Sequence, residues 1–399
     1  MLTLATPPGL AFDPVLPTRD ALLDAAVVRE RLTDVLGIPV RASTRVRAKY
    51  RIVESLRVVY RLTLDGADRL VSARTFARDP GSGTWDPKLG CSWWTFPDDR
   101  RLRGLDRLLR PAGRLAGMAP GWATSQVVEY APERSATFRA LDRAGSTVGY
   151  VKAYPPGSGQ GARFADRYEQ VSDALRGTEV TAPRVLGRAA DLLLLEEMPG
   201  LPWNGLSPAD GNQALTAMGR AIATLHGLEV SRLAALPRFG RLQLGRVGRS
   251  ADLVGLACPQ LAERLGAVRD RLLATAPAEA GQDVLLHGDC HPKNGLVHRG
   301  RVALIDLDQA GLGPAAADIG SLLARLRLEP GGADLAGCFL QGYARIRPLP
   351  RDAVLRWHTA AALVAERAVR AVNRVHSAAL AALPELIDDA ADLLAKGAS

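Results

Sequence analysis

Residues 285–308 constrain this 399-residue chain more than any other segment, because they place several polar side chains between two short apolar runs. The segment reads LLHGDCHPKNGLVHRGRVALIDLD. Leu285 and Leu286 precede the polar turn and residues 302–305 follow it, so two short buried strands are expected. Such strands would hold ligands rigidly, as Mg²⁺ requires, because Mg²⁺ tolerates little departure from octahedral geometry.

The polar residues of this segment are of the kinds that phosphoryl transfer needs. Transfer of a γ-phosphoryl group requires a carboxylate that orients a hydroxyl and accepts its proton, and oxygen ligands that hold Mg²⁺ against the phosphates. Asp289 can serve as the carboxylate. Asn294 offers an uncharged oxygen and Asp306 an ionised one, so together they can bind the metal.

The spacing H-G-D-C-H-P-K-N followed by I-D-L-D resembles the signature of the aminoglycoside phosphotransferase and choline kinase family, small-molecule relatives of the protein kinases. Protein kinases carry H-R-D-x-x-x-x-N and D-F-G at the corresponding places. The resemblance implies that Asp289 is the catalytic base and that Asn294 and Asp306 bind the metal. It also implies that His287 and His291 brace the loop.

The same resemblance predicts an ATP-binding region before this loop. Strands are expected at 127–130, 136–141 and 148–154, and Lys152 lies in the third, where kinases place a lysine that contacts the α- and β-phosphates. The helix expected near 161–176 offers Asp166 and Glu169 as partners for this lysine. Glu169 is preferred because its spacing from Lys152 is similar to the family's.

No glycine-rich loop precedes Lys152. The first two strands are joined by A-P-E-R-S-A at 131–136, whose backbone approaches phosphates less freely than glycines would. Arg134 and Ser135 are therefore expected to contact the phosphates. The apolar run LLLLEE ends at Glu197 and resembles the family's interlobe hinge, so Glu197 and Met198 are expected to lie against adenine and bond it through their backbone.

The expected fold class is α+β, a bilobal protein-kinase-like fold with an extra N-terminal α+β cap domain. The cap would span 1–125, the antiparallel-sheet N-lobe with its hinge 126–200, and the mostly helical C-lobe 201–399. Residues 49–83 and 129–159 share a strand pattern and a P-G-S-G turn, so the cap is either a degenerate duplicate of the N-lobe or an unrelated pair of hairpins.

The net charge of +9 is concentrated at the N-terminus, since residues 1–125 hold 20 Lys and Arg against 13 Asp and Glu, and the remainder 31 against 29. Nucleic-acid binding is not favoured, because the kinase-like part is almost neutral. The four cysteines lack metal-ligand spacing. No stretch reaches the roughly 18 apolar residues of a membrane span, and the first twenty residues lack signal-peptide features, so a cytoplasmic protein without membrane partners is expected.

Helices expected at 332–346, 351–376 and 382–396 would form the acceptor pocket by family analogy, and 237–251 would be a loop. Two charged sets there are Arg367, Arg370 and Arg374 on one helix face, and Glu385, Asp388, Asp389 and Asp392 on the last helix. A cationic aminoglycoside would favour the acids and an anionic or neutral sugar the arginines, while solvated helix faces would account for both sets.

Asp318 matches a family position that braces the catalytic loop, although an acid in a first helical turn is also favoured by the helix dipole. We predict an ATP- and Mg²⁺-dependent phosphotransferase acting on a hydroxyl of a small molecule, with an aminoglycoside, amino sugar or other sugar as acceptor. The alternatives are a kinase of Ser or Thr in a modified peptide, or a nonenzymatic pseudokinase-like module that docks through its basic N-terminal region. The sequence leaves the oligomeric state open.

Overall fold

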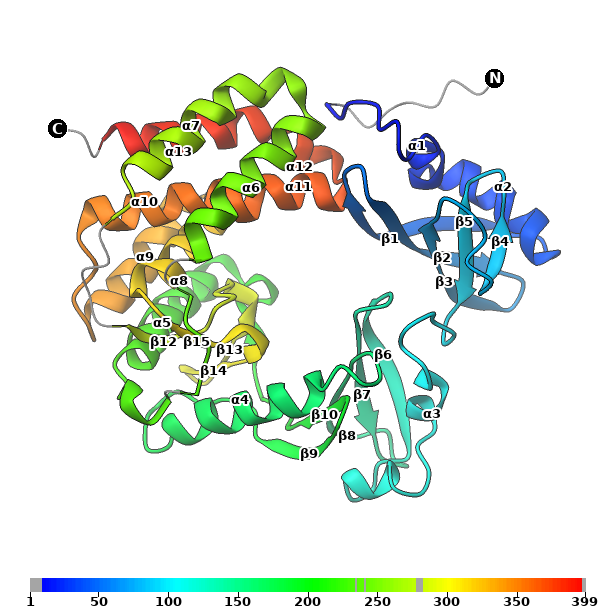
Figure 1. Ribbon diagram of the computed structural model, residues 1–399. Coiled ribbons are helices and arrows are strands. Elements are labelled where there is room, and N and C mark those ends of the chain that lie inside the picture. The colour runs from blue at the N-terminus through cyan, green and yellow to red at the C-terminus, as the bar shows by residue number, and fades with distance from the viewer. Residues whose placement is uncertain (1–8, 234, 240–241, 278–282, 397–399) are drawn as a thin grey trace.

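The computed structural model describes residues 9–233, 235–239, 242–277 and 283–396, so the first eight residues of the expected cap lie outside it. Two antiparallel sheets and a large helical region are arranged around a common centre (Figure 1). Among the described residues, no helix combines the length and apolar character needed to cross a membrane. The mixture of antiparallel sheets and helices agrees with the expected α+β class.

The N-terminal region forms the first five-stranded sheet, preceded by two helices. Its elements are α1 (Arg19–Leu23), α2 (Ala25–Leu36), β1 (Ala42–Arg51), β2 (Ser55–Leu64), β3 (Ala67–Thr75), β4 (Thr84–Asp86) and β5 (Cys91–Thr95), with strand order β1-β2-β3-β5-β4. The Asp24 side chain caps α2 by accepting from the backbone N–H groups of Ala26 and Val27. Tyr50 and Tyr60 are fully buried in the core that this sheet shares with neighbouring helices.

The second five-stranded sheet follows after the short helix α3 (Leu105–Leu109) and contains Lys152. Its elements are β6 (Thr124–Ala131), β7 (Ser135–Leu141), β8 (Thr147–Ala153), α4 (Gln160–Ala174), β9 (Val185–Ala189) and β10 (Leu192–Leu195), with strand order β6-β7-β8-β10-β9. Both sheets place their fifth strand between their third and fourth. Only the second sheet has a helix between its third and fourth strands, and the duplication stays a prediction.

The remaining elements form the helical region and two small sheets. They are β11 (Leu201–Pro202), α5 (Pro208–His226), α6 (Leu242–Ala257), α7 (Ala262–Ala274), β12 (Val284–Leu286), β13 (Gly295–His298), β14 (Arg301–Leu304), β15 (Gly311–Gly313), α8 (Ala315–Leu326), α9 (Gly332–Ala344), α10 (Asp352–Ala362), a π-helical turn (Leu363–Ala368), α11 (Val369–Arg374), α12 (Ser377–Ala381) and α13 (Leu383–Ala395). The strands expected at 285–286 and 302–305 are present as β12 and β14, but they do not pair with each other, because β12 pairs with β15 and β14 forms a hairpin with β13.

Helix α6 corrects the expected loop at 237–251. It begins at Leu242, and residues 240–241 lie outside the described part of the chain. Val247, Ala251 and Val254 are buried at helical spacing, because α6 packs against α7 and against the π-helical turn. The Arg and Gly residues of this segment obscured its apolar face.

The N-terminal sheet packs on the C-terminal helices rather than standing apart. β1 lies against α11, as the blue strand beside the orange-red helix shows (Figure 1). The Arg45 side chain donates a 2.9 Å hydrogen bond to the backbone oxygen of Val375, and Ala11 N–H donates one of 2.8 Å to Ala257. One apolar core joins this sheet to α6, α7, α10, α11 and α13. The N-terminal region is therefore fixed to the lobe that carries the catalytic loop.

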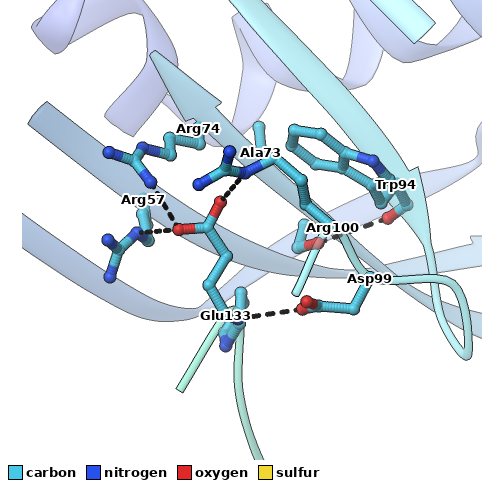
Figure 2. A pocket seen from close by; sticks show the side chains of 9 residues that line it. Arg57, Ala73, Arg74, Trp94, Asp99, Arg100 and Glu133 are labelled. Carbon is cyan, nitrogen blue, oxygen red and sulfur yellow. Dashed lines mark hydrogen bonds and ion pairs between the residues drawn. The ribbon is translucent and has the colours of Figure 1, made fainter. Parts of the chain in front are cut away.

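The two five-stranded sheets meet at Glu133, in the turn between β6 and β7. Its side chain enters a small pocket on the N-terminal sheet and pairs with Arg57, Arg74 and Arg100 over 2.9, 2.6 and 2.5 Å (Figure 2). The backbone N–H of Glu133 donates to the Asp99 carboxylate over 2.9 Å (Figure 2). Burial alone would raise the pKa of Glu133, but the Arg100 hydrogen bond and the other two guanidinium charges hold that pKa below its ordinary value.

Candidate active site

The loop that follows β12 is held by the side chain of Asp318 and by close contacts with the backbone of Ile305 and Gln309. The carboxylate of Asp318 on α8 accepts from the backbone N–H groups of His287 (2.6 Å) and Gly288 (3.0 Å). The His287 ring nitrogen Nε2 lies 2.9 Å from the backbone oxygen of Ile305. Gly288 has a φ of 79°, and a Cβ there would lie 1.9 Å from the backbone oxygen of Gln309. The loop therefore has little freedom to move.

Asp318 is itself fixed by a buried histidine. His226 Nε2 lies 3.2 Å from Asp318 Oδ2, and His226 Nδ1 lies 3.0 Å from the Tyr343 hydroxyl. Burial opposes ionisation of Asp318, but the hydrogen bond and charge of His226 and the bond from His287 keep its pKa below the ordinary value. His226 is thus a core residue that supports the loop, and Asp318 links it to the catalytic segment.

Asp289 is oriented from two sides. The guanidinium NH2 of Arg325, on α8, donates to Asp289 Oδ1 over 2.5 Å, and the Arg325 side chain is only 6% exposed. The Asn294 side-chain nitrogen donates to the Asp289 backbone oxygen over 3.0 Å. His291 accepts from the Lys293 backbone N–H, and burial together with nearby Arg325 lowers the His291 pKa to about 2, so its ring is neutral.

Lys152 joins the second sheet to the end of the β13–β14 hairpin. Its Nζ lies 2.6 Å from Asp306 Oδ1 and 2.7 Å from Asp308 Oδ1, with the Tyr168 hydroxyl at 3.3 Å. Burial alone would lower the Lys152 pKa, but Tyr168 and the two carboxylates raise it well above its ordinary value. Asp306 has a left-handed backbone with φ 60°, which turns its side chain out of the strand direction. The pKa of Asp306 is lowered by Lys152 despite burial.

The structure corrects the predicted partner of Lys152. Glu169 is exposed and lies 3.6 Å from Arg188, whereas the adjacent Tyr168 is fully buried and faces the lysine. Neighbouring residues on a helix point about 100° apart, so α4 can turn only one of them inward. The Tyr168 ring completes the core, and its hydroxyl also accepts from the Leu307 backbone N–H over 3.0 Å. The carboxylates that pair with Lys152 are Asp306 and Asp308.

Sequence reasoning missed three side chains at this site. Asp308 binds Lys152 and also accepts from the Tyr154 hydroxyl over 3.1 Å. Asp308 could have been predicted because it is the second acid of I-D-L-D (305–308). Tyr154 could have been predicted because it follows Lys152 by two residues in the strand expected at 148–154, so both side chains lie on the same face. Arg325 lies 36 residues after Asp289, and no local pattern connects the two.

The other predicted nucleotide-binding residues lie outside this network of hydrogen bonds and ion pairs. Arg134 is exposed in the β6–β7 turn, and its charge contributes to the low pKa of Asp306, so it lies on the site's side of that turn. Ser135 is the half-buried first residue of β7. Between β10 and β11, Glu197 is exposed and Met198 half-buried. Their contacts with a nucleotide stay predictions.

The residues at the hairpin fit an Mg²⁺ ion that also binds phosphates. Asp306 and Asp308 offer carboxylate oxygens, and the amide of Asn294 has its nitrogen engaged, which leaves its oxygen for a cation. Within the described ranges no group of three or more His, Cys, Asp or Glu side chains could hold a metal ion by itself. Such a sparse set is typical of Mg²⁺, which keeps several waters and is completed by substrate phosphates.

The comparisons with known proteins agree with this geometry. The model of the phosphotransferase enzyme family matches residues 128–355, more than half of the chain. A comparison with curated proteins found no match. Among solved structures, a thermostable mutant of aminoglycoside phosphotransferase APH(4)-Ia has a TM-score of 0.52 at 14% identity, covering 69% of this chain and 96% of that one. Amicoumacin kinase hAmiN in complex with AMP-PNP, Ca²⁺ and Ami has a TM-score of 0.50 at 17% identity, covering 72% and 91%.

A third similar structure is the macrolide 2′-phosphotransferase MphH from Brachybacterium faecium, with a TM-score of 0.47 at 22% identity over 71% of this chain and 97% of that one. At TM-scores of 0.50 and above, the first two likenesses show a shared fold, so the expected bilobal kinase-like class is confirmed. The family match shows that this chain belongs to the phosphotransferase enzyme family and is a small-molecule kinase.

Proposed function

We propose that this protein transfers the γ-phosphoryl group of ATP, with Mg²⁺, to a hydroxyl group of a small molecule of the sugar class. The observation that carries the proposal is the connection of two units through Asn294: Asp289, fixed by Arg325, and Lys152, bound to Asp306 and Asp308. The Asn294 side chain bonds the Asp289 backbone, and its backbone oxygen accepts from Ile305, the residue before Asp306. The two units come from the two lobes, and they supply the base and the phosphate-binding charges that the reaction needs.

In this proposal Asp289 orients the acceptor hydroxyl and accepts its proton. Its bond to Arg325 keeps one carboxylate oxygen engaged and leaves Oδ2 for the substrate. Holding the hydroxyl in line for attack is the main contribution of such a residue, because phosphoryl transfer depends on positioning and electrostatics.

Lys152 binds the phosphates, and Asp306 and Asn294 hold the metal, with Asp308 and Tyr154 keeping Lys152 in place. Bound Mg²⁺ supplies positive charge against the phosphate oxygens. Arg134 and Ser135 contact the phosphates from the β6–β7 turn, while Glu197 and Met198 lie against the adenine. The turn itself is anchored to the N-terminal sheet through Glu133, so that sheet limits how far the turn can open.

The acceptor expected from the family resemblance is an aminoglycoside, an amino sugar or another sugar. Similar structures carry the names of aminoglycoside, macrolide and amicoumacin kinases, so the fold is used with several acceptors. The choice among acceptors therefore depends on the residues around Asp289 in this chain.

The proposal is tested by thermal shift and by ADP release with purified protein. ATP with Mg²⁺ at about a hundred times Kd is expected to stabilise the fold by about 2.7 kcal/mol. Asp289→Asn should keep this stabilisation and lose turnover, while Asp306→Ala should lose its Mg²⁺-dependent part. Asp173→Asn, an exposed change on α4, is the matched control. Failure of ATP and Mg²⁺ to stabilise the wild type would contradict the proposal and favour a nonenzymatic binding module.

A further inference from the structure

A row of arginines leads away from Asp289 along the C-terminal helices. It begins with Arg325 on α8 and continues with Arg367 in the π-helical turn and with Arg370 and Arg374 on α11. The last three are separated by three and four residues, so they share one helix face. π-helical turns within α-helices are frequent at functional sites.

The N-terminal sheet adds to this row. β1 packs against α11, and the Arg45 bond to the Val375 backbone fixes their contact. The same strand carries Arg47 and Lys49. The charge of Arg47 acts on Arg374 and the charge of Arg374 acts on Lys49, although Arg47 also pairs with Glu129 over 2.6 Å. The basic excess found in residues 1–125 thus contributes to the surroundings of the catalytic loop.

Two members of the row are buried with donors that have no partner in the described structure. The Arg325 side chain is 6% exposed. Its Nη2 atom binds Asp289, while its Nε and Nη1 atoms make no hydrogen bond. The Arg367 side chain is 9% exposed, and its Nε is also unpaired. Besides Asp289, which Arg325 binds over 2.5 Å, the two arginines share one acid, Glu366, at 3.8 and 3.6 Å, which also accepts from Ser321. Buried guanidinium donors require acceptor oxygens, and these donors lack them.

Burial and mutual repulsion both act on the pKa values of the arginines in the row. Burial, followed by the charges of neighbouring arginines, lowers the pKa of Arg367 and of Arg374 to about 10. Burial and the charges of Arg374 and other arginines lower the pKa of Lys49 to about 8. An anion bound among these groups would relieve that repulsion.

Two of the four acids on the helix that could have received a cationic acceptor are engaged elsewhere. On α13, Asp388 pairs with Arg264 of α7, and Asp389 lies 3.0 Å from Arg327. These carboxylates are thus neutralised by arginines outside the row. The structure therefore favours the arginine set, because Arg325 at the start of the row binds Asp289.

We propose that the acceptor is anionic: a hydroxylated small molecule whose carboxylate, phosphate or sulfate group binds Arg367, Arg370 and Arg374 while its hydroxyl faces Asp289. This inference rests on the proposed function and narrows its acceptor class. It disfavours a polycationic aminoglycoside, which the same arginines would repel. In the proposed function the nucleotide's phosphates bind elsewhere, at Lys152 and at the metal that Asp306 and Asn294 would hold.

Four compounds that share a hexose skeleton but differ in charge test this proposal. Glucose, glucosamine, glucuronate and glucose 6-phosphate are titrated by calorimetry into the full-length protein saturated with ADP and Mg²⁺, so that the nucleotide site is filled. At least one of the two anions should bind about tenfold more tightly than glucose and glucosamine, as expected for one charge-assisted hydrogen-bonded contact.

The variants Arg370→Gln and Arg374→Gln should each weaken that anion's binding by about tenfold and leave ADP affinity unchanged. Arg345→Gln, an exposed change at the end of α9, serves as the matched control and should bind like wild type. Equal binding of all four compounds, absence of binding by both anions, or tightest binding of glucosamine would overturn the anionic acceptor. If the wild-type protein did not bind ADP with Mg²⁺, the proposed function itself would be overturned. This result differs from the results that would overturn only the anionic acceptor.

Discussion

Arg325 and Asp289 are joined by a hydrogen bond of 2.5 Å between the guanidinium NH2 and the carboxylate Oδ1. The bond connects the last turn of α8 to the loop that follows β12. A guanidinium is planar and presents its donors in a fixed arrangement, so it restricts the rotation of the carboxylate more than an ammonium would. Arg325 is therefore a positioning residue for Asp289.

Replacing Arg325 by Gln should lower kcat by about a hundredfold, because a misplaced base loses alignment with the acceptor hydroxyl. The KM for ATP should change little, since Lys152 and Asp306 do not contact Arg325. Steady-state ADP release gives both constants. Arg325→Lys should recover part of kcat. Arg327→Gln, two residues further on in a surface pair, is the control. Equal losses in Arg325→Gln and Arg327→Gln would contradict a role through Asp289.

Asp308, rather than Glu169, should control the affinity for ATP. Asp308→Asn removes a charge that holds Lys152 at 2.7 Å and should raise the KM for ATP about tenfold, consistent with loss of a charged hydrogen bond. Glu169→Gln disturbs only an exposed pair with Arg188 and should change that KM less than twofold. Titrations of ATP at saturating Mg²⁺ compare the two variants. A larger increase of the KM for ATP in Glu169→Gln than in Asp308→Asn would favour the pairing of Lys152 with Glu169 that the sequence predicted.

Gly288 should be far less tolerant of a side chain than Gly300, although both have a left-handed φ, 79° and 77°. Gly288→Ala places its Cβ 1.9 Å from the Gln309 backbone oxygen, whereas Gly300→Ala meets nothing within 4 Å. Gly300→Ala should cost about 1 kcal/mol of unfolding free energy from the backbone conformation alone. Gly288→Ala should cost clearly more and reduce turnover. Urea unfolding and ADP release test both, and similar losses would contradict the steric reason.

Replacing Glu133 by Gln should destabilise the fold by about 1–2 kcal/mol at pH 7, since the removal of one partner leaves three arginines facing one another. This loss of unfolding free energy is smaller than for a fully buried ion pair, because water partly screens the partly exposed arginines. Glu54→Gln, in an exposed pair with Arg51, is the control and should cost less than about 0.5 kcal/mol. Urea midpoints measure the difference.

The same variant should alter acid sensitivity. The pKa of Glu133 is below its ordinary value in the folded protein, so the unfolded chain takes up this proton first as the pH falls. The stability that Glu133 contributes is thus present above about pH 4.5 and is lost as the pH falls through the lower, folded pKa. Glu133→Gln should lose less stability than wild type between pH 5 and pH 3. An identical acid profile would indicate that Glu133 is not ionised in the fold.

Lys49 should make anion binding sensitive to alkaline pH. Its pKa of about 8 reflects burial and the surrounding charges of Arg374, Arg134, Arg51 and Arg47. As the pH rises through 8 the ammonium loses its proton, so the affinity for the glucuronate or glucose 6-phosphate probe should fall. Calorimetry at pH 7 and pH 9 measures this, and Lys49→Met should remove the difference.

The free energy of unfolding should rise with pH over the range in which the anion affinity falls. An unfolded lysine keeps its proton up to about pH 10.4, so the unfolded chain binds more protons than the folded one between pH 8 and that value. The unfolding free energy should therefore rise with pH across this window in wild type, and rise less in Lys49→Met. A wild-type profile that matches the variant would show that Lys49 keeps its charge in the fold.

The sequence alone determined the kinase-like class of the fold and predicted Asp289, Asn294 and Asp306 as residues of the site. Asp289, Asn294 and Asp306 lie within 18 residues of one another, and the apolar runs beside them specify the strands that bring them together. Such local patterns can be predicted from the sequence, because the turn, the apolar strands and the polar residues at the ends of those strands all lie in one continuous segment.

Only the tertiary structure decided which side chains complete the site. The choice of Asp308 over Glu169 depended on which face of α4 turned inward, and Arg325 reached Asp289 from another helix. Arg47 and Lys49 lie near the row of arginines because β1 packs on α11, which is more than 300 residues away in the chain. Burial of apolar faces brought these charged groups together, and the chain carries no local signal for contacts of such long range.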